Sequence, residues 1–135
     1  INNEPIEVFN NGNHTRDFTY IDDITEGIIK ILSKIPEPNS EWTSSDPDPA
    51  SSNCPWRIYN IGNNNPVQLL EYIDALQKAL NKKAKKNFLP LQLGDVPNTF
   101  ANIDNLKNQV NFHPSTSVQD GISNFVKWYK QYYKI

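Results

Sequence analysis

Hydrophobic residues recur at helical spacing in three long stretches of the chain, and each stretch predicts an amphipathic helix. The first begins at Asp22 or Asp23, either of which we expect to act as its N-cap, and ends before Pro36. The second follows Pro66, and the last starts near Ser117. The apolar positions that define the three helices are Ile24, Ile28, Ile31, Leu32 and Ile35; Leu69, Leu70, Ile73, Leu76 and Leu80; and Val118, Ile122, Phe125, Val126, Tyr129 and Tyr133. A shorter helix is expected around residues 103–110.

Four short segments rich in β-branched and aromatic residues predict strands. Residues 6–9 alternate and end in the turn signal Asn10-Asn11-Gly12-Asn13, after which residues 16–21 are again extended. These two segments predict a hairpin or two neighbouring short strands. Residues 57–61 predict a buried strand, and Phe88-Leu89 predicts a further short one.

Residues 36–56 differ in composition from the rest of the chain. Five prolines stand there among Ser, Asp, Glu and Asn residues. This composition predicts a long loop, which is unusual inside a compact domain and indicates a functional, flexible or family-specific insertion.

The alternation of helices and strands indicates an α/β or α+β class. The predicted strands are too short and too few for a doubly wound sheet, so we expect one small mixed lobe of helices and short strands over residues 1–135. The 135 residues include no Met and begin with Ile1, from which we expect a fragment of a longer protein.

Charge and hydropathy exclude several classes of function. The net charge is −2, and the one basic run, Lys82 to Lys86, lacks interleaved aromatic residues, so we expect no nucleic-acid partner. No apolar run is long enough for a membrane span, and no secretory signal is visible. The single Cys54 excludes an intramolecular disulfide, and we take the cytoplasm as the compartment.

The sequence carries no complete catalytic or cofactor motif. No G-x-G-x-x-G pattern passes through its five glycines, and no Tyr is followed four residues later by Lys. His14, His113 and Cys54 lack metal-ligand spacing, so we expect no metal site and interpret both histidines as surface or loop residues.

Arginine usage points to one candidate binding residue. Only Arg16 and Arg57 among the 13 basic residues are arginines. Where Lys is the usual cation, an Arg suggests that the planar guanidinium is needed for a bidentate contact with an anion. For Arg16 the alternative is a structural salt bridge with Asp17, Asp22 or Asp23.

Asp95 is the second candidate, because it lies in a Gly-Asp-Val-Pro turn between two apolar segments. A carboxylate on a loop can accept hydrogen bonds from both hydroxyls of a ribose. The alternative is a carboxylate that caps the turn or a helix.

Four motifs in this order resemble the carboxy-terminal part of extended short-chain dehydrogenase/reductase nucleotide-sugar epimerases. They are RDFTYIDDI (16–24), YNIGNNNPVQLLEYI (59–73), GDVPNTFANI (94–103) and TSVQDGISNFVKWY (116–129). The first motif is shared by dehydratases, decarboxylases and epimerases of the superfamily. The proline-rich insertion and the segment LPLQLGDVP resemble the UDP-glucuronate 4-epimerase branch, which is linked to capsular polysaccharide biosynthesis.

The resemblance implies a two-lobe enzyme that interconverts UDP-glucuronate and UDP-galacturonate by hydride transfer to and from NAD. It places NAD and the catalytic residues in an amino-terminal Rossmann domain, outside residues 1–135, and implies a homodimeric parent. This chain would then be the substrate-binding lobe, without catalytic residues, and would bind the UDP-sugar without binding NAD.

The resemblance also assigns residues to the substrate. Arg16 matches the arginine that pairs with the UDP phosphates, and Asp95 matches the residue that hydrogen-bonds the ribose. Val8 and Phe9 fall where the family contacts the uracil, and Val67 matches a position that lines the pocket. Gln92 stands where many galactose epimerases have a second phosphate arginine, and Leu93 where the family usually has Pro.

Two other functions remain open at the level of sequence. One is another enzyme of the superfamily, a dehydratase or a decarboxylase. The other is a non-enzymatic interaction module that uses the amphipathic helices and the proline-rich loop.

Overall fold

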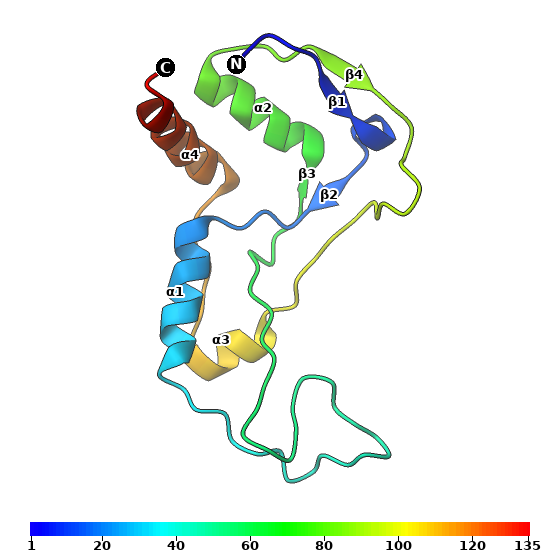
Figure 1. Ribbon diagram of the computed structural model, residues 1–135, viewed down its shortest axis with the longest axis vertical. Helices are drawn as coiled ribbons and strands as arrows, with labels where there is room; N and C mark the ends of the chain where they lie inside the picture. Colours follow the sequence, from blue (N-terminus) through cyan, green and yellow to red (C-terminus); the bar gives the residue numbers. More distant parts are fainter.

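The computed structural model describes residues 1–135 as a mixed α/β structure (Figure 1), which confirms the predicted fold class. The strands are short and form two separate two-stranded sheets. In chain order the elements are β1 (Ile6–Val8), the 3-10 helix η1 (Phe9–Gly12), β2 (Thr15–Arg16), α1 (Ile21–Leu32), β3 (Val67–Gln68), α2 (Leu69–Leu80), β4 (Lys86–Phe88), α3 (Asp104–Val110) and α4 (Val118–Tyr133).

Both sheets pair segments that are far apart in the sequence. β1 is parallel to β4, with Val8 opposite Phe88, and β2 is antiparallel to β3, with Arg16 opposite Val67. Of the two predicted alternatives the hairpin is therefore wrong, whereas two short strands are present and do not pair with each other. Asn10 and Asn11 have φ values of 50° and 51° inside η1 and do not form a two-residue hairpin turn, so β1 and β2 each pair with a later strand.

The strand predicted over residues 57–61 is absent. Only an isolated bridge between Ser51 and Arg57 occurs there, and Ile58 is 50% exposed. This segment has no strand partner within the chain, and an apolar run forms a strand only where a neighbour offers a ladder.

The helices lie close to their predicted positions. α1 starts at Ile21 and has no side-chain cap, so neither Asp22 nor Asp23 is the N-cap. α2 starts three residues after Pro66, because residues 67 and 68 pair with β2. The start of α4 is as predicted, since the Ser117 side chain accepts a hydrogen bond from the backbone N–H of Asp120.

The apolar residues form two small cores. One lies between α2 and α4, where Ala75, Ile122 and Val126 are buried. The other is formed by Ile103, Leu106 and Phe112 and lies between α3 and α1. Figure 1 shows α2, α4 and the four strands in one half of the molecule, and α1 with α3 in the other.

The proline-rich segment, residues 36–56, contains no helix or strand, as predicted, and extends from the α1–α3 end (Figure 1). Polar contacts join its two halves and order the residues around Ser51. The Ser51 hydroxyl donates to Asp48, the Asn39 amide donates to Ser51 Oγ at 2.9 Å, and the Ala50 N–H donates to Asp48 at 3.0 Å.

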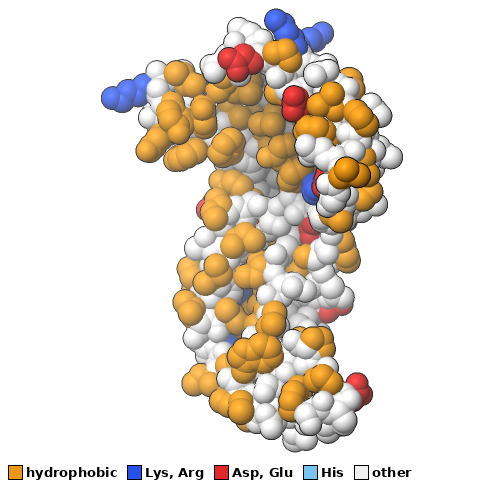
Figure 2. Space-filling model, turned by 45° about the vertical axis from the view of Figure 1, so that its right-hand side comes forward, with side chains coloured by type: hydrophobic (Ala, Val, Ile, Leu, Met, Phe, Trp, Pro, Cys, Tyr) orange, Lys and Arg blue, Asp and Glu red, His pale blue; other side chains and the backbone are white.

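A large part of the apolar surface is exposed. Only 15 of the 135 residues are buried, while 20 large hydrophobic residues are exposed, among them Leu32, Phe100 and Trp128. Figure 2 shows hydrophobic side chains along the whole length of one face. No helix combines the length and the apolar character that crossing a membrane requires.

Candidate functional site

The candidate site is built where β2 lies between two other extended segments. On one side β2 pairs with β3. On the other side, the Thr15 N–H donates to Pro97 O at 3.0 Å, and the Thr99 N–H donates to Thr15 O at 3.2 Å. These bonds fix residues 95–99 beside β2, and so bring Asp95 to Arg16 although 79 residues separate them.

The Arg16 guanidinium is anchored to the chain by three hydrogen bonds. Nη1 donates to Thr15 O at 2.9 Å and to Pro97 O at 3.0 Å, while Nη2 donates to Asp95 Oδ1 at 3.2 Å. A guanidinium carries five N–H donors, so two of them, including the Nε–H, have no partner within the chain. The side chain is 26% exposed, which leaves those donors within reach of a ligand.

Arg16 does form a salt bridge, but its partner is none of the three aspartates considered from the sequence. The partner is Asp95, which is 30% exposed. Asp17 and Asp23 bond to backbone N–H groups instead, and Asp22 lies exposed in the first turn of α1. The neighbouring sequence does not indicate Asp95 as the partner, because only the pairing of β2 with residues 97–99 brings Asp95 near Arg16.

Asp95 ends a tight turn that starts at Gln92. The Asp95 N–H donates to Gln92 O at 3.2 Å, and Gly94 has a φ of +85°, as the third residue of a type II turn requires. Gln92 and Leu93 are both exposed on this turn. The turn directs the Asp95 carboxylate back toward β2, where its second oxygen, Oδ2, lies 3.3 Å from His14 Nε2.

His14 is a component of this cluster that the sequence analysis missed. It is only 4% exposed, so its interpretation as a surface histidine is wrong, although it does lie in the loop between η1 and β2. A signal was present in the sequence. His14 stands two residues before Arg16, and side chains at positions i and i+2 of an extended segment share a face.

Asp17, the residue after Arg16, holds the surrounding loops together. Its Oδ1 accepts from the Asn65 N–H at 3.2 Å, and its Oδ2 accepts from the N–H groups of Asn64 at 3.1 Å and Ala101 at 3.2 Å. Gly62 makes this approach possible, since a Cβ there would lie 2.8 Å from Asp17 Oδ2. The carboxylate therefore fixes residues 62–65 and 101 around β2.

Asp23 plays a similar part at the start of α1. It is 4% exposed, and its Oδ2 accepts a hydrogen bond from the Thr116 N–H at 3.1 Å. Oδ1 accepts from the Ser115 N–H at 3.4 Å. These bonds attach the loop before α4 to α1.

The other predicted site residues are distributed around this cluster. Val67 is half-buried on β3, directly opposite Arg16. Val8 and Phe9 lie at the junction of β1 and η1, beside β4. Val8 is 1% exposed and its carbonyl accepts from the Leu89 N–H at 3.0 Å, so its side chain belongs to the core. Phe9 is half-buried and remains more accessible than Val8.

The glycines of the chain do not form a cradle for the diphosphate of a dinucleotide. Such a cradle needs glycine backbone that is open to the phosphates at the start of a helix. Gly94 is open but lies in the turn before Asp95, ten residues ahead of α3. At the other glycines, Gly12, Gly27, Gly62 and Gly121, a methyl group would meet Leu70, Phe112, Ala101 and Tyr20 in turn. The chain therefore lacks the glycine-rich cradle by which a dinucleotide-binding domain holds NAD.

The structure contains no cluster of three or more His, Cys, Asp or Glu side chains that could hold a metal ion. Cys54 is a free, exposed thiol in the proline-rich segment. Neither feature contributes to the candidate site.

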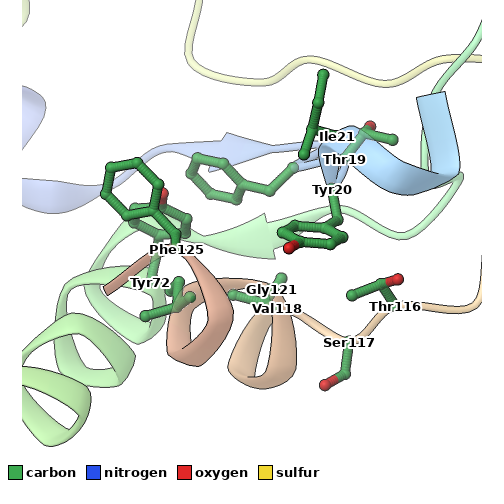
Figure 3. A pocket seen from close by; sticks show the side chains of 11 residues that line it. Thr19, Tyr20, Ile21, Tyr72, Thr116, Ser117, Val118, Gly121 and Phe125 are labelled. Atoms are coloured by element: carbon green, nitrogen blue, oxygen red, sulfur yellow. The ribbon is translucent and has the colours of Figure 1, made fainter. Parts of the chain in front are cut away.

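An apolar cleft of about 220 Å³ lies between the β2–α1 linker and the start of α4 (Figure 3). Its lining begins at Phe18, two residues after Arg16 in the sequence. Phe18 and Tyr72 line it and stack on each other with ring centroids 3.9 Å apart. Figure 3 shows the Tyr20 ring beside Gly121 of α4. Arg16 and Asp95 do not line this cleft, so the polar cluster and the cleft are separate features.

Comparison with known proteins gives a consistent family relationship. Residues 1–62 match the sequence model of the NAD dependent epimerase/dehydratase family. Protein CapI of Staphylococcus aureus is 51% identical over 134 residues, which cover 99% of this chain and 40% of that protein. A "Probable UDP-glucuronate 4-epimerase" of Rhizobium meliloti is 42% identical over 135 residues, covering 98% and 39%.

The fold is also similar to that of a solved epimerase. The crystal structure of UDP-glucuronic acid 4-epimerase from Bacillus cereus in complex with UDP-glucuronic acid and NAD superposes with a TM-score of 0.74 at 30% identity. The match covers 97% of this chain and 37% of that one. The chain thus spans about 30–40% of the length of the curated relatives it matches. The family resemblance predicted from the four motifs is confirmed.

Proposed function

We propose that this chain, an epimerase-family segment homologous to part of the UDP-glucuronate 4-epimerases, is the lobe that binds the UDP-sugar in an NAD-dependent nucleotide-sugar epimerase. The parent protein would interconvert UDP-glucuronate and UDP-galacturonate for polysaccharide synthesis. The observation that carries this proposal is the convergence of Arg16 and Asp95 from segments 79 residues apart.

In this proposal Arg16 binds the diphosphate. Its three bonds to the chain fix the plane of the guanidinium, and two N–H donors remain for phosphate oxygens. A planar group with fixed orientation and free donors is suited to bidentate phosphate binding, which a flexible Lys ammonium would not reproduce. As a phosphate approaches, Arg16 would exchange part of its contact with Asp95 for the ligand.

Asp95 accepts hydrogen bonds from the two ribose hydroxyls. The turn from Gln92 to Asp95 presents the carboxylate beside Arg16, with Oδ1 3.2 Å from Arg16 Nη2, so both groups could face one nucleotide. Phe9 would contact the uracil, with Val8 contributing through its backbone alone, and Val67 would line the pocket beside Arg16. Gln92 stands at the start of the turn as a neutral contact to the ligand.

The hydride transfer itself belongs to residues outside this chain. NAD, held by the rest of the parent enzyme, would supply the redox chemistry at C4 of the sugar. Since the chain offers neither a cradle for NAD nor a Tyr-Lys pair, its own contribution is to hold the nucleotide while the sugar is presented to the rest of the enzyme.

The exposed apolar surface supports a second lobe as partner. Twenty large hydrophobic residues are exposed, and Figure 2 shows hydrophobic side chains along one face; contiguous apolar surface of this kind marks interaction sites. We propose that the Rossmann domain of the parent covers part of this surface, that the parent is a cytoplasmic homodimer, and that neither nucleic acid nor membrane is a partner.

The test uses the full-length protein that contains this chain. Arg16→Lys should weaken UDP binding at least about tenfold by calorimetry, since a bidentate charged contact is lost. Arg57→Lys is the matched control, because Arg57 directly follows the proline-rich segment, pairs with Ser51 there and lies outside the site. Equal UDP affinity in the Arg16→Lys variant and the unmodified protein would exclude the phosphate role.

The same protein separates the reaction classes. Incubation with UDP-glucuronate should yield UDP-galacturonate, identified by proton NMR. Release of carbon dioxide would identify a decarboxylase, and no turnover of any UDP-sugar would favour a binding module.

A further inference from the structure

We propose that His14 is a positioning residue for Asp95, and that it holds the carboxylate in place for the ribose while Arg16 engages the diphosphate. The inference rests on the proposed roles of Arg16 and Asp95 and deepens them. It concerns a side chain to which neither motif nor spacing assigned any function.

The position of His14 is fixed from both sides. Its backbone N–H donates to Gly12 O at 2.9 Å. Its backbone carbonyl accepts a hydrogen bond of 2.8 Å from the N–H of Leu69, the first residue of α2. The side chain is 4% exposed. The imidazole is therefore a rigid group beneath the site, with little freedom to leave its place.

The His14 ring faces the carboxylate of Asp95. Its Nε2 atom is buried and has no aligned hydrogen-bond partner, while Asp95 Oδ2 lies 3.3 Å away. That distance permits a hydrogen bond, and a small rotation of the carboxylate would align it. Because a buried polar nitrogen without a partner is costly, we expect Nε2 to carry the proton and this bond to form when a ligand binds.

Asp95 needs His14 as a partner because its other partner, Arg16, also has to bind the diphosphate in the proposed function. Oδ1 bonds to Arg16 Nη2 at 3.2 Å, and Oδ2 faces His14. When Arg16 turns toward a diphosphate, the Asp95–Arg16 bond weakens and His14 remains as the fixed contact. The carboxylate then keeps the orientation in which it accepts the hydroxyls of the ribose.

The test compares UDP with 2′,3′-dideoxy-UDP, which has the same base and diphosphate but no ribose hydroxyls. In the full-length protein, His14→Leu should weaken UDP binding about tenfold, the equivalent of one charge-assisted hydrogen bond, and leave the dideoxy ligand within about twofold. His14→Gln, whose amide reaches the position of Nε2, should remain within about threefold of the unmodified protein for both ligands. His113→Gln is the matched control at an exposed histidine.

The outcomes separate this inference from the proposed function. If His14→Leu binds UDP normally, or weakens both ligands equally, the positioning role is wrong. If that variant does not fold, His14→Gln and His14→Asn provide the comparison, because the shorter Asn amide does not reach Asp95; equal UDP affinity in both overturns the inference. If Asp95→Ala leaves the ratio of the two affinities unchanged, Asp95 is not the ribose ligand and both proposals fail.

Discussion

Asp17 Oδ2 accepts a hydrogen bond from the backbone N–H of Ala101, 3.2 Å away and 84 positions further along the chain. The same carboxylate binds the N–H groups of Asn64 and Asn65. One side chain thus joins three segments that the sequence separates widely. Since Asp17 directly follows Arg16, the hydrogen bonds of Asp17 also fix the position of Arg16 relative to residues 64, 65 and 101.

Replacing Asp17 by Asn should therefore affect both stability and binding. The amide keeps the shape of the side chain but has one acceptor oxygen in place of two and no charge. We expect a loss of about 2 kcal/mol in the free energy of unfolding, the range for hydrogen bonds to a charged group, measured by urea denaturation. UDP affinity should fall in the same variant. Asp22→Asn, an exposed neighbour in the first turn of α1, is the control; it should leave UDP affinity unchanged and lower the free energy of unfolding by less than about 1 kcal/mol.

Gly62 offers a test of the same junction by added volume. A Cβ at this position would lie 2.5 Å from the Cβ of Ala101. Gly62→Ala should cost about 1–3 kcal/mol of stability, as overpacked sites do. Adding Ala101→Gly should recover part of that loss in a double-mutant cycle, since it removes one of the clashing atoms. Strict additivity of the two substitutions would mean that their contact is not the source of the cost.

The proline-rich segment provides a prediction about pH. The Ser51 hydroxyl, followed by the Ala50 N–H, lowers the pKa of Asp48 below its usual value. A carboxyl group whose pKa is lower in the folded state stabilises that state above its unfolded pKa, and this contribution disappears as pH falls through the folded pKa. We therefore expect the loop to loosen in the acid range. Carboxyl-carbon NMR titration should show a higher Asp48 pKa in Ser51→Ala, and an unchanged pKa would remove Ser51 as the cause.

The exposed hydrophobic residues predict the behaviour of the isolated chain. Residues 1–135 alone should self-associate and bind a hydrophobic dye, because Ile29, Leu32 and Phe100 remain in water. The full-length protein should bind less dye per molecule. Sedimentation velocity and dye fluorescence measure the difference, and a monomeric chain 1–135 with no dye binding would contradict the proposed covering by a second lobe.

The local sequence pattern determined those elements whose formation depends on neighbouring residues. The apolar spacing of 118–133 and the Ser117 cap predicted α4, and the composition of 36–56 predicted a loop, because helix periodicity, capping and proline geometry act over a few residues. The same reasoning identified Arg16 and Asp95 one at a time, as residues suited to an anion and to a sugar. The family motifs joined them to one substrate.

Tertiary structure decided the partners. The pairing of β1 with β4 and of β2 with β3 replaced the expected hairpin, and the segment 57–61 found no strand to join. The contact of Arg16 with Asp95, the burial of His14 and the three bonds of Asp17 all depend on segments about 50 to 85 residues apart. Sequence patterns report preferences within a few residues, whereas these contacts follow from strand pairing and burial across the whole chain, and only the folded structure specifies them.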